Sequence, residues 1–137
     1  MRTRRGIGPL LVAGLITVTA AATSGDQRST LQWAAVYLNQ PTLIGSTIVQ
    51  GPVVFVHDEA KMARGEPCTS IRLFEPGVGT GDEVAAFHCI PIRRDHVRSF
   101  TVRTRPNLEL GFGCVLTEYQ FAGDAEGHGV PYPINAH

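Results

Sequence analysis

The chain has 137 residues, about the length of one domain. Lys and Arg together number 12, and Asp and Glu together also number 12, so the formal net charge is zero with neutral histidines. This balance excludes a protein that binds nucleic acid by its overall charge, and a hydrophobic content of 43% excludes a disordered acidic chain. A polytopic membrane protein is excluded as well, because the sequence contains no series of long apolar segments.

Residues 1–22 have the pattern of a signal peptide. Arg2, Arg4 and Arg5 precede the apolar run 7–22, which ends in small residues. The run is shorter than the roughly 20 apolar residues of a membrane span. We therefore expect cleavage, a secreted or periplasmic domain over 23–137, and no membrane span after removal. Loss of the three arginines leaves nine basic against 12 acidic residues, a net charge of −3.

Short apolar segments separated by Gly and Pro predict strands. The expected strands are 31–38, 43–49, 52–57, 69–74, 83–90, 98–104 and 114–121. A short helix is expected over 58–64, with Asp58 at its start. The tail after Phe121 is rich in Gly and Pro and is expected to be irregular. The predicted class is all-β, an antiparallel β-sandwich or small barrel with one short helix.

The expected compartment affects the state of the three cysteines. Export to an oxidising environment favours a disulfide, and Cys68 with Cys89 is the preferred pair. Closing that loop of about 20 residues would stabilise the fold by roughly 3 kcal/mol on the chain-entropy model. Cys114 lies in an apolar stretch and is expected to be a buried free thiol, although it is also an alternative partner. Thiolate binding to a metal is the other use that the cysteines allow.

Histidines and carboxylates supply candidate metal ligands. The candidates are His57, Asp58, His88, Glu118, Asp124 and His128. Imidazole and carboxylate groups would suit zinc or copper if the fold brought them together. Each candidate also has a structural explanation: Asp58 as a helix cap, His88 on the strand face opposite Cys89, and the acidic tail as a solvated loop. No strong zinc signature occurs, so no cofactor is predicted outright, and we expect the imidazoles at the rims of the sheets.

Other chemistry-bearing motifs are missing from the sequence. The glycine-rich segment 77–81 lacks the Lys-Ser or Lys-Thr of a phosphate-binding loop, and there is no Gly-x-Ser-x-Gly elbow. A basic cluster lies around the strand expected over 98–104, and either protects an edge strand or forms a ledge for an anionic ligand. Its members are Arg93, Arg94, Arg98, Arg103 and Arg105.

The stretch 41–130 resembles a group of small exported bacterial proteins that have no characterised function. The residues that carry the resemblance are PTLIGSTIVQGPVVFVHDEAKMARGEPCT, FHCIP and EYQFAGDAEGHGVP. The resemblance implies an exported β-rich domain, and it implies no activity, cofactor or catalytic residue.

Three hypotheses of function follow. The first is an exported binding or interaction protein for an unknown protein or small ligand, without evident catalysis. The second is a metal-binding protein that uses His57, His88 and His128 with nearby carboxylates. The third is an enzyme whose site is built from those same groups. A cluster of imidazoles would favour the second, and an exposed apolar patch would favour the first.

Overall fold

The computed structural model describes residues 31–132. The predicted signal peptide and its cleavage site lie outside the described residues. The strands are β1 (Leu31–Ile44), β2 (Thr47–Asp58), β3 (Thr69–Glu75), β4 (Gly79–Phe87), β5 (Ile90–Arg93), β6 (Thr101–Pro106), β7 (Cys114–Gln120) and β8 (Glu126–Gly129). The expectation of an all-β protein is confirmed.

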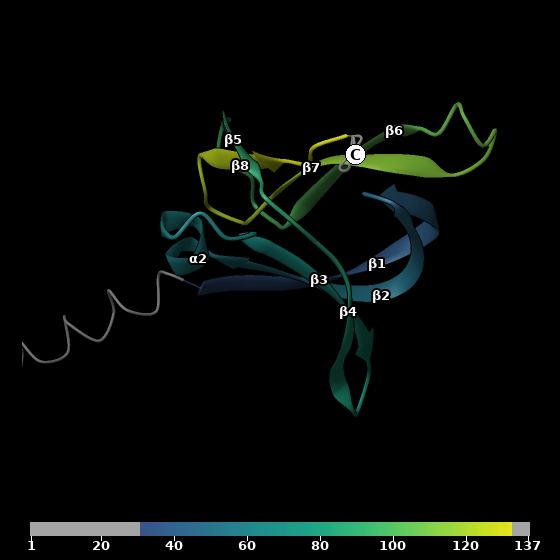
Figure 1. Cartoon of the computed structure of the whole chain (residues 1–137), viewed down its shortest axis with the longest axis horizontal. Coiled ribbons are helices and arrows are strands. Elements are labelled where there is room, and N and C mark those ends of the chain that lie inside the picture. Colours follow the sequence, from purple (N-terminus) through teal and green to yellow (C-terminus); the bar gives the residue numbers. More distant parts are fainter. Residues whose placement is uncertain (1–30, 133–137) are drawn as a thin grey trace, which may run out of the picture. The chain divides into compact units, whose positions relative to one another are not determined.

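The eight strands form one sheet. Its order is β4-β3-β2-β1-β7-β8-β5, and β6 pairs with β7 off this path. All pairings are antiparallel except that of β1 with β7, where Thr42 lies opposite Cys114 and Leu43 opposite Val115. The sheet is not closed into a barrel, so the barrel alternative does not hold. Figure 1 shows strands β1–β4 in one layer and β5–β8 in the other.

Aromatic side chains join the two layers. The ring of Phe55 in β2 lies 5.1 Å from that of Tyr119 in β7 and 5.2 Å from that of Phe100, centroid to centroid. Phe121 also packs against Phe100 and Tyr119, with ring centroids 5.2 and 5.7 Å away. Full burial of one such side chain contributes about 1.5–3 kcal/mol. The hydrophobic core therefore lies between the two halves of the sheet.

Several predicted boundaries differ from the structure. The expected strand 43–49 is divided by the turn between β1 and β2, and the expected strand 83–90 is found as β4 (Gly79–Phe87), followed by a separate β5. Gly51 and Pro52 were expected to start a strand but lie inside β2, opposite Leu38 and Tyr37 of β1. Residues 126–129 were expected to be irregular but form β8. Their backbone groups pair with β5 on one side and β7 on the other, and this pairing stabilises a strand that the glycine-rich local sequence disfavours.

The predicted short helix is α2 (Glu59–Ala63). Asp58 caps it: its Oδ1 accepts hydrogen bonds from the backbone N–H groups of Ala60 at 2.9 Å and Lys61 at 3.4 Å. A tight turn at residues 45–46 separates β1 from β2, with Gly45 at a φ of +68°. Over residues 31–132, no helix has the length and apolar character needed to cross a membrane.

Candidate metal site

One histidine and two cysteines form a buried cluster at the end of the sheet where β2 meets α2. One ligand atom from each of His57, Cys68 and Cys89 lies within 4.8 Å of the other two. The relative exposures of the three residues are 0%, 3% and 8%. Imidazole nitrogen and thiolate sulfur are the donors that zinc and copper(I) prefer. The cluster therefore has the composition of a transition-metal site.

Backbone pairing brings these residues together from distant parts of the chain. His57 is the last residue of β2 that pairs with β3, and it lies opposite Thr69, the first residue of β3. The backbone N–H of Asp58 donates to the carbonyl oxygen of Cys68 at 2.9 Å, which holds Cys68 next to the strand end. The backbone N–H of Cys89 donates to Cys68 Sγ at 3.2 Å. The antiparallel register of β2, β3 and β4 thus places the three ligand groups side by side.

His128 adds a second imidazole beside the cluster. Its ring centroid lies 4.3 Å from that of His57 and 4.8 Å from the stacked ring of Tyr119. The Tyr119 hydroxyl is hydrogen-bonded to Thr69 Oγ1. His128 lies in β8, opposite Tyr119 of β7, so the imidazole pair bridges the two halves of the sheet.

The two imidazoles are buried without hydrogen bonds. His57 is 0% and His128 is 2% exposed. Neither Nδ1 nor Nε2 of either ring has a hydrogen-bond partner among the described residues. Most buried side-chain polar atoms have such a partner, and leaving one unsatisfied costs about 1–3 kcal/mol. Four unpaired ring nitrogens at one place are therefore unusual for ordinary core residues.

Burial also sets the protonation of the cluster. It lowers the pKa of His57, against the opposing effect of Glu59 and other nearby carboxylates. Burial, followed by the charge of His57, lowers the pKa of His128 to about 4. Burial and hydrogen bonding to Cys68 raise the pKa of Cys89 to about 12. At neutral pH the imidazoles are therefore neutral, as metal ligands must be, whereas the Cys89 thiol ionises only when a cation compensates its charge.

All three cysteines are free thiols in the structure. The predicted disulfide partners Cys68 and Cys89 lie close together in the fold, without a bond between them. Cys114 is buried as expected, in β7, with its Sγ 3.4 Å from Thr42 Oγ1. It belongs to a different part of the core and takes no part in the cluster.

The predicted ligands divide into two groups. His57 and His128 come together, although they are buried and not at the rims as expected. His88 is exposed, in the connection between β4 and β5 and not in a strand as expected, and lies outside the cluster. Asp58 is occupied as the cap of α2, and Asp124 accepts a hydrogen bond from Gln32 Nε2 at 3.0 Å. The hypothesis of a three-histidine site is therefore replaced by one of a histidine–cysteine site.

Glu118 has a structural role. It is buried and accepts two hydrogen bonds from Arg94, at 2.8 and 2.6 Å, and one from Arg103 at 3.2 Å. The hydrogen bonds from Arg94 lower the pKa of Glu118 below its usual value, although burial opposes this. Two members of the predicted basic cluster thus compensate the charge of one buried carboxylate.

The grouping of the two cysteines with His57 was not predicted from the sequence. Cys68 and Cys89 were expected to form a disulfide, and no spacing between residues 57, 68, 89 and 128 matches a known metal motif. One signal was present: a histidine at the end of a strongly predicted strand, followed by a cysteine just before the next strand. In an antiparallel hairpin these two positions become neighbours.

No protein-family model matches the chain, and neither the curated proteins nor the solved structures contain a detectable match. Any function proposed for this protein therefore rests on the geometry and chemistry of the site.

Proposed function

We propose that this protein binds a transition-metal ion through His57, Cys68 and Cys89, with His128 as the neighbouring imidazole. The observation that carries the proposal is the convergence of one imidazole and two thiols within 4.8 Å, all buried. The unpaired nitrogens of both histidines support it. A bound ion would satisfy buried polar atoms that otherwise lack partners.

Zinc is the ion that fits best. Two thiolates compensate the charge of Zn²⁺, so the complex with neutral imidazoles is neutral and can be buried at low cost. Copper(I) in the same site would leave one uncompensated negative charge. Zinc in proteins is usually four-coordinate, and His57, Cys68 and Cys89 supply three positions. His128, whose ring centroid lies 4.3 Å from that of His57, is the candidate for the fourth.

We further propose that the site works outside the cytoplasm, as residues 1–22 and the resemblance to small exported proteins suggest. In an oxidising compartment a bound ion would protect the two thiols from forming a disulfide. Loading with metal and oxidation of Cys68 and Cys89 are therefore mutually exclusive states of the same site.

Metal titration of the reduced, metal-free chain tests the proposal. We expect one Zn²⁺ per chain in competition with a chromophoric chelator, and a thiolate-to-metal charge-transfer band when Co²⁺ is used. His57→Ala and Cys89→Ser should each weaken binding by at least about 100-fold, since loss of a residue that only supports a ligand already costs 10–100-fold. Circular dichroism checks that each variant is folded.

The chain offers a matched control for each variant. His88→Ala removes an exposed histidine next to the site in sequence, and Cys114→Ser removes a buried cysteine from another part of the core. Both should bind zinc as the wild type does. A wild-type chain that binds neither ion, or equal losses in the controls, would refute the proposal.

A second candidate function is the interaction protein expected from the sequence. The observation in its favour is an apolar pocket of about 310 Å³ on the β1–β4 part of the sheet, lined by Leu31, Trp33, Val54, Val56 and Phe74 together with residues 79–80. Trp33 is 66% exposed. An extended apolar peptide would suit such a surface. A shift in the fluorescence of Trp33, the single tryptophan of the chain, on titration with such peptides would support this function, and no shift would argue against it.

A further inference from the structure

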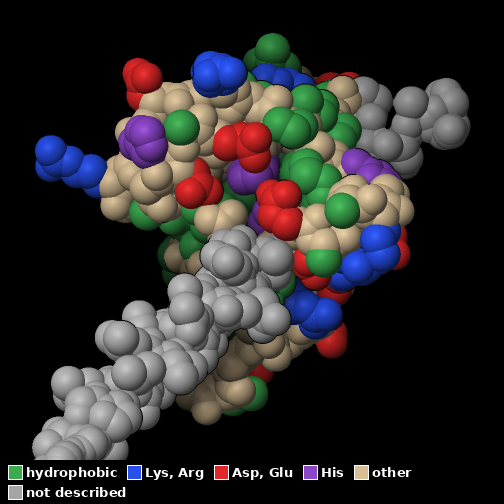
Figure 2. Space-filling view, turned by 90° about the vertical axis from the view of Figure 1, so that its left-hand side faces the viewer, with side chains coloured by type: hydrophobic (Ala, Val, Ile, Leu, Met, Phe, Trp, Pro, Cys, Tyr) green, Lys and Arg blue, Asp and Glu red, His purple; other side chains and the backbone are tan. Residues whose placement is uncertain are grey.

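An acidic pocket lies on the surface beside the buried cluster. It encloses about 590 Å³ and is lined by Gln32, Glu59, Pro91, Ile92, Arg93, Asp124, Ala125 and Glu126. Figure 2 shows acidic side chains gathered on this face, with histidine visible between them. The side chains that line the pocket include three carboxylates and one guanidinium, so their formal net charge is −2.

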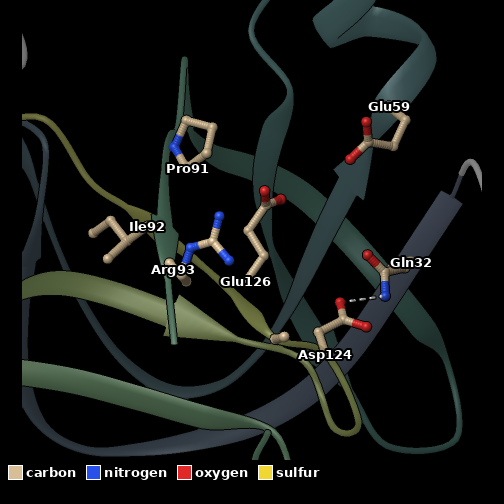
Figure 3. A pocket seen from close by; sticks show the side chains of 8 residues that line it. Gln32, Glu59, Pro91, Ile92, Arg93, Asp124 and Glu126 are labelled. Carbon is tan, nitrogen blue, oxygen red and sulfur yellow. Dashed lines mark hydrogen bonds between the residues drawn. The ribbon is translucent and has the colours of Figure 1, made fainter. Parts of the chain in front are cut away.

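The carboxylates come from separate segments that converge. Glu59 belongs to the first turn of α2, Glu126 begins β8, and Asp124 precedes it in the loop after β7. In Figure 3 the side chains of Glu59 and Glu126 point into the same space, and Gln32 of β1 holds Asp124 by a hydrogen bond of 3.0 Å. Arg93 lies opposite Glu126 in the β5–β8 pairing.

The pocket adjoins the candidate metal site through one contact. Glu59 Oε2 lies 3.6 Å from His57 Nδ1, too far for a hydrogen bond. The Glu59 side chain is 48% exposed, whereas that of His57 is 0% exposed. Glu59 therefore faces solvent on one side and an unpartnered, fully buried ligand nitrogen on the other. This buried nitrogen distinguishes the pocket from an ordinary group of surface carboxylates.

We propose that the acidic pocket captures hydrated divalent cations and is the route by which they reach His57, Cys68 and Cys89. This inference rests on the proposed function, because it concerns access to that site. Glu59, Asp124 and Glu126 are the capturing groups, and Glu59 is the carboxylate adjacent to the inner ligand. None of the three is a ligand in the final complex.

The chemistry of the two sites supports transfer in this direction. Carboxylates in a solvated pocket bind divalent cations weakly and exchange them quickly, whereas thiolates and imidazoles hold zinc tightly. A cleft with charge of one sign raises the local concentration of an oppositely charged ligand and its association rate by 10–10³-fold, an effect that salt weakens. The carboxylates should thus control the rate of loading and not the nature of the complex.

Stopped-flow mixing of Co²⁺ with the reduced, metal-free full-length chain tests this. We compare the wild type with the triple variant Glu59→Gln, Asp124→Asn, Glu126→Gln, which removes charge and conserves size. The triple variant should load at least about tenfold more slowly at low salt, with little remaining salt dependence. Its final Co²⁺ absorption spectrum should equal that of the wild type, since the inner ligands are unchanged.

The control is a second triple variant with the same chemical changes at exposed carboxylates that do not line the pocket: Glu75→Gln, Asp82→Asn and Glu109→Gln. It should load at close to the wild-type rate. Equal loading by the pocket variant and the wild type would overturn the capture role, and so would a changed spectrum, because the carboxylates would then be ligands. A wild type that takes up no Co²⁺ would refute the proposed function itself, and this inference with it.

Discussion

The imidazole rings of His57 and His128 lie against each other inside the protein, with centroids 4.3 Å apart and planes inclined by 40°. His57 belongs to β2 and His128 to β8, so the contact joins the two halves of the sheet. Neither ring has a hydrogen-bond partner among the described residues. In the metal-free protein this pair therefore carries a polar desolvation cost that a bound cation would relieve.

Replacing His128 should increase the stability of the metal-free protein and weaken metal binding. We expect His128→Leu, a change to an apolar side chain of similar size, to raise the free energy of unfolding of the metal-free protein by about 1–3 kcal/mol, because two unsatisfied buried nitrogens are removed. The same variant should gain less stability from added Zn²⁺ than the wild type does. Urea unfolding with and without Zn²⁺ measures both effects.

The control for this prediction is His88→Ala, which changes an exposed histidine and should alter stability by no more than about 0.5 kcal/mol. A large loss of stability in metal-free His128→Leu would mean that His128 is a satisfied core residue and not an unpaired ligand group.

Metal should protect the cysteine pair from oxidation. When the metal-free chain is treated with diamide, a two-electron oxidant, we expect Cys68 and Cys89 to form a disulfide. Each thiol gives up one hydrogen and the oxidant is reduced to the hydrazine, so intact mass falls by two hydrogens. Zn²⁺-loaded protein should resist the reaction, since its thiolates are bound.

Mass spectrometry of the digested protein identifies the bond in this experiment. Cys114→Ser should behave as the wild type does, because Cys114 lies elsewhere in the core. A bond to Cys114, or oxidation at the same rate with and without Zn²⁺, would contradict the arrangement of the site.

Glu118 should make stability depend on pH in the acidic range. The hydrogen bonds from Arg94 lower the pKa of Glu118 below its ordinary value near 4.5. The unfolded chain therefore takes up the proton first as the pH falls. The contribution of Glu118 to stability is complete above about pH 4.5 and is lost as the pH falls through the lower folded-state pKa.

The variant Glu118→Gln tests this. At pH 7 we expect it to lower the free energy of unfolding by about 1.5–3 kcal/mol, the usual contribution of hydrogen bonds to a charged group. The difference from the wild type should shrink in urea unfolding experiments at pH 4 and below. Glu75→Gln, at an exposed position, is the control, and a pH-independent difference for Glu118→Gln would argue against the ionised pair.

Local sequence patterns were sufficient for most of the secondary structure. Apolar segments bounded by Gly and Pro predicted the strands, and an acid before a run of helix formers predicted α2 with Asp58 as its cap. His88 is exposed and Cys89 is buried, as predicted, although both lie in the connection between β4 and β5 and not in a strand. These features depend on neighbouring residues, whose preferences the sequence displays directly.

The sequence could not reveal β8 or the cluster of His57, Cys68 and Cys89. The four residues of β8 form a strand because β5 and β7 supply its backbone partners, and nothing in the local composition favours this. No short motif indicates that His57 contacts the two cysteines or that its ring contacts that of His128.

The sequence by itself thus determined the all-β class, the positions of most strands, the capped helix and the types of side chain able to bind a metal. Only the tertiary structure decided which of those side chains meet and which of them are buried. The physical reason is that strand pairing and layer packing join residues far apart in the chain, through backbone hydrogen bonds that carry no local sequence signature.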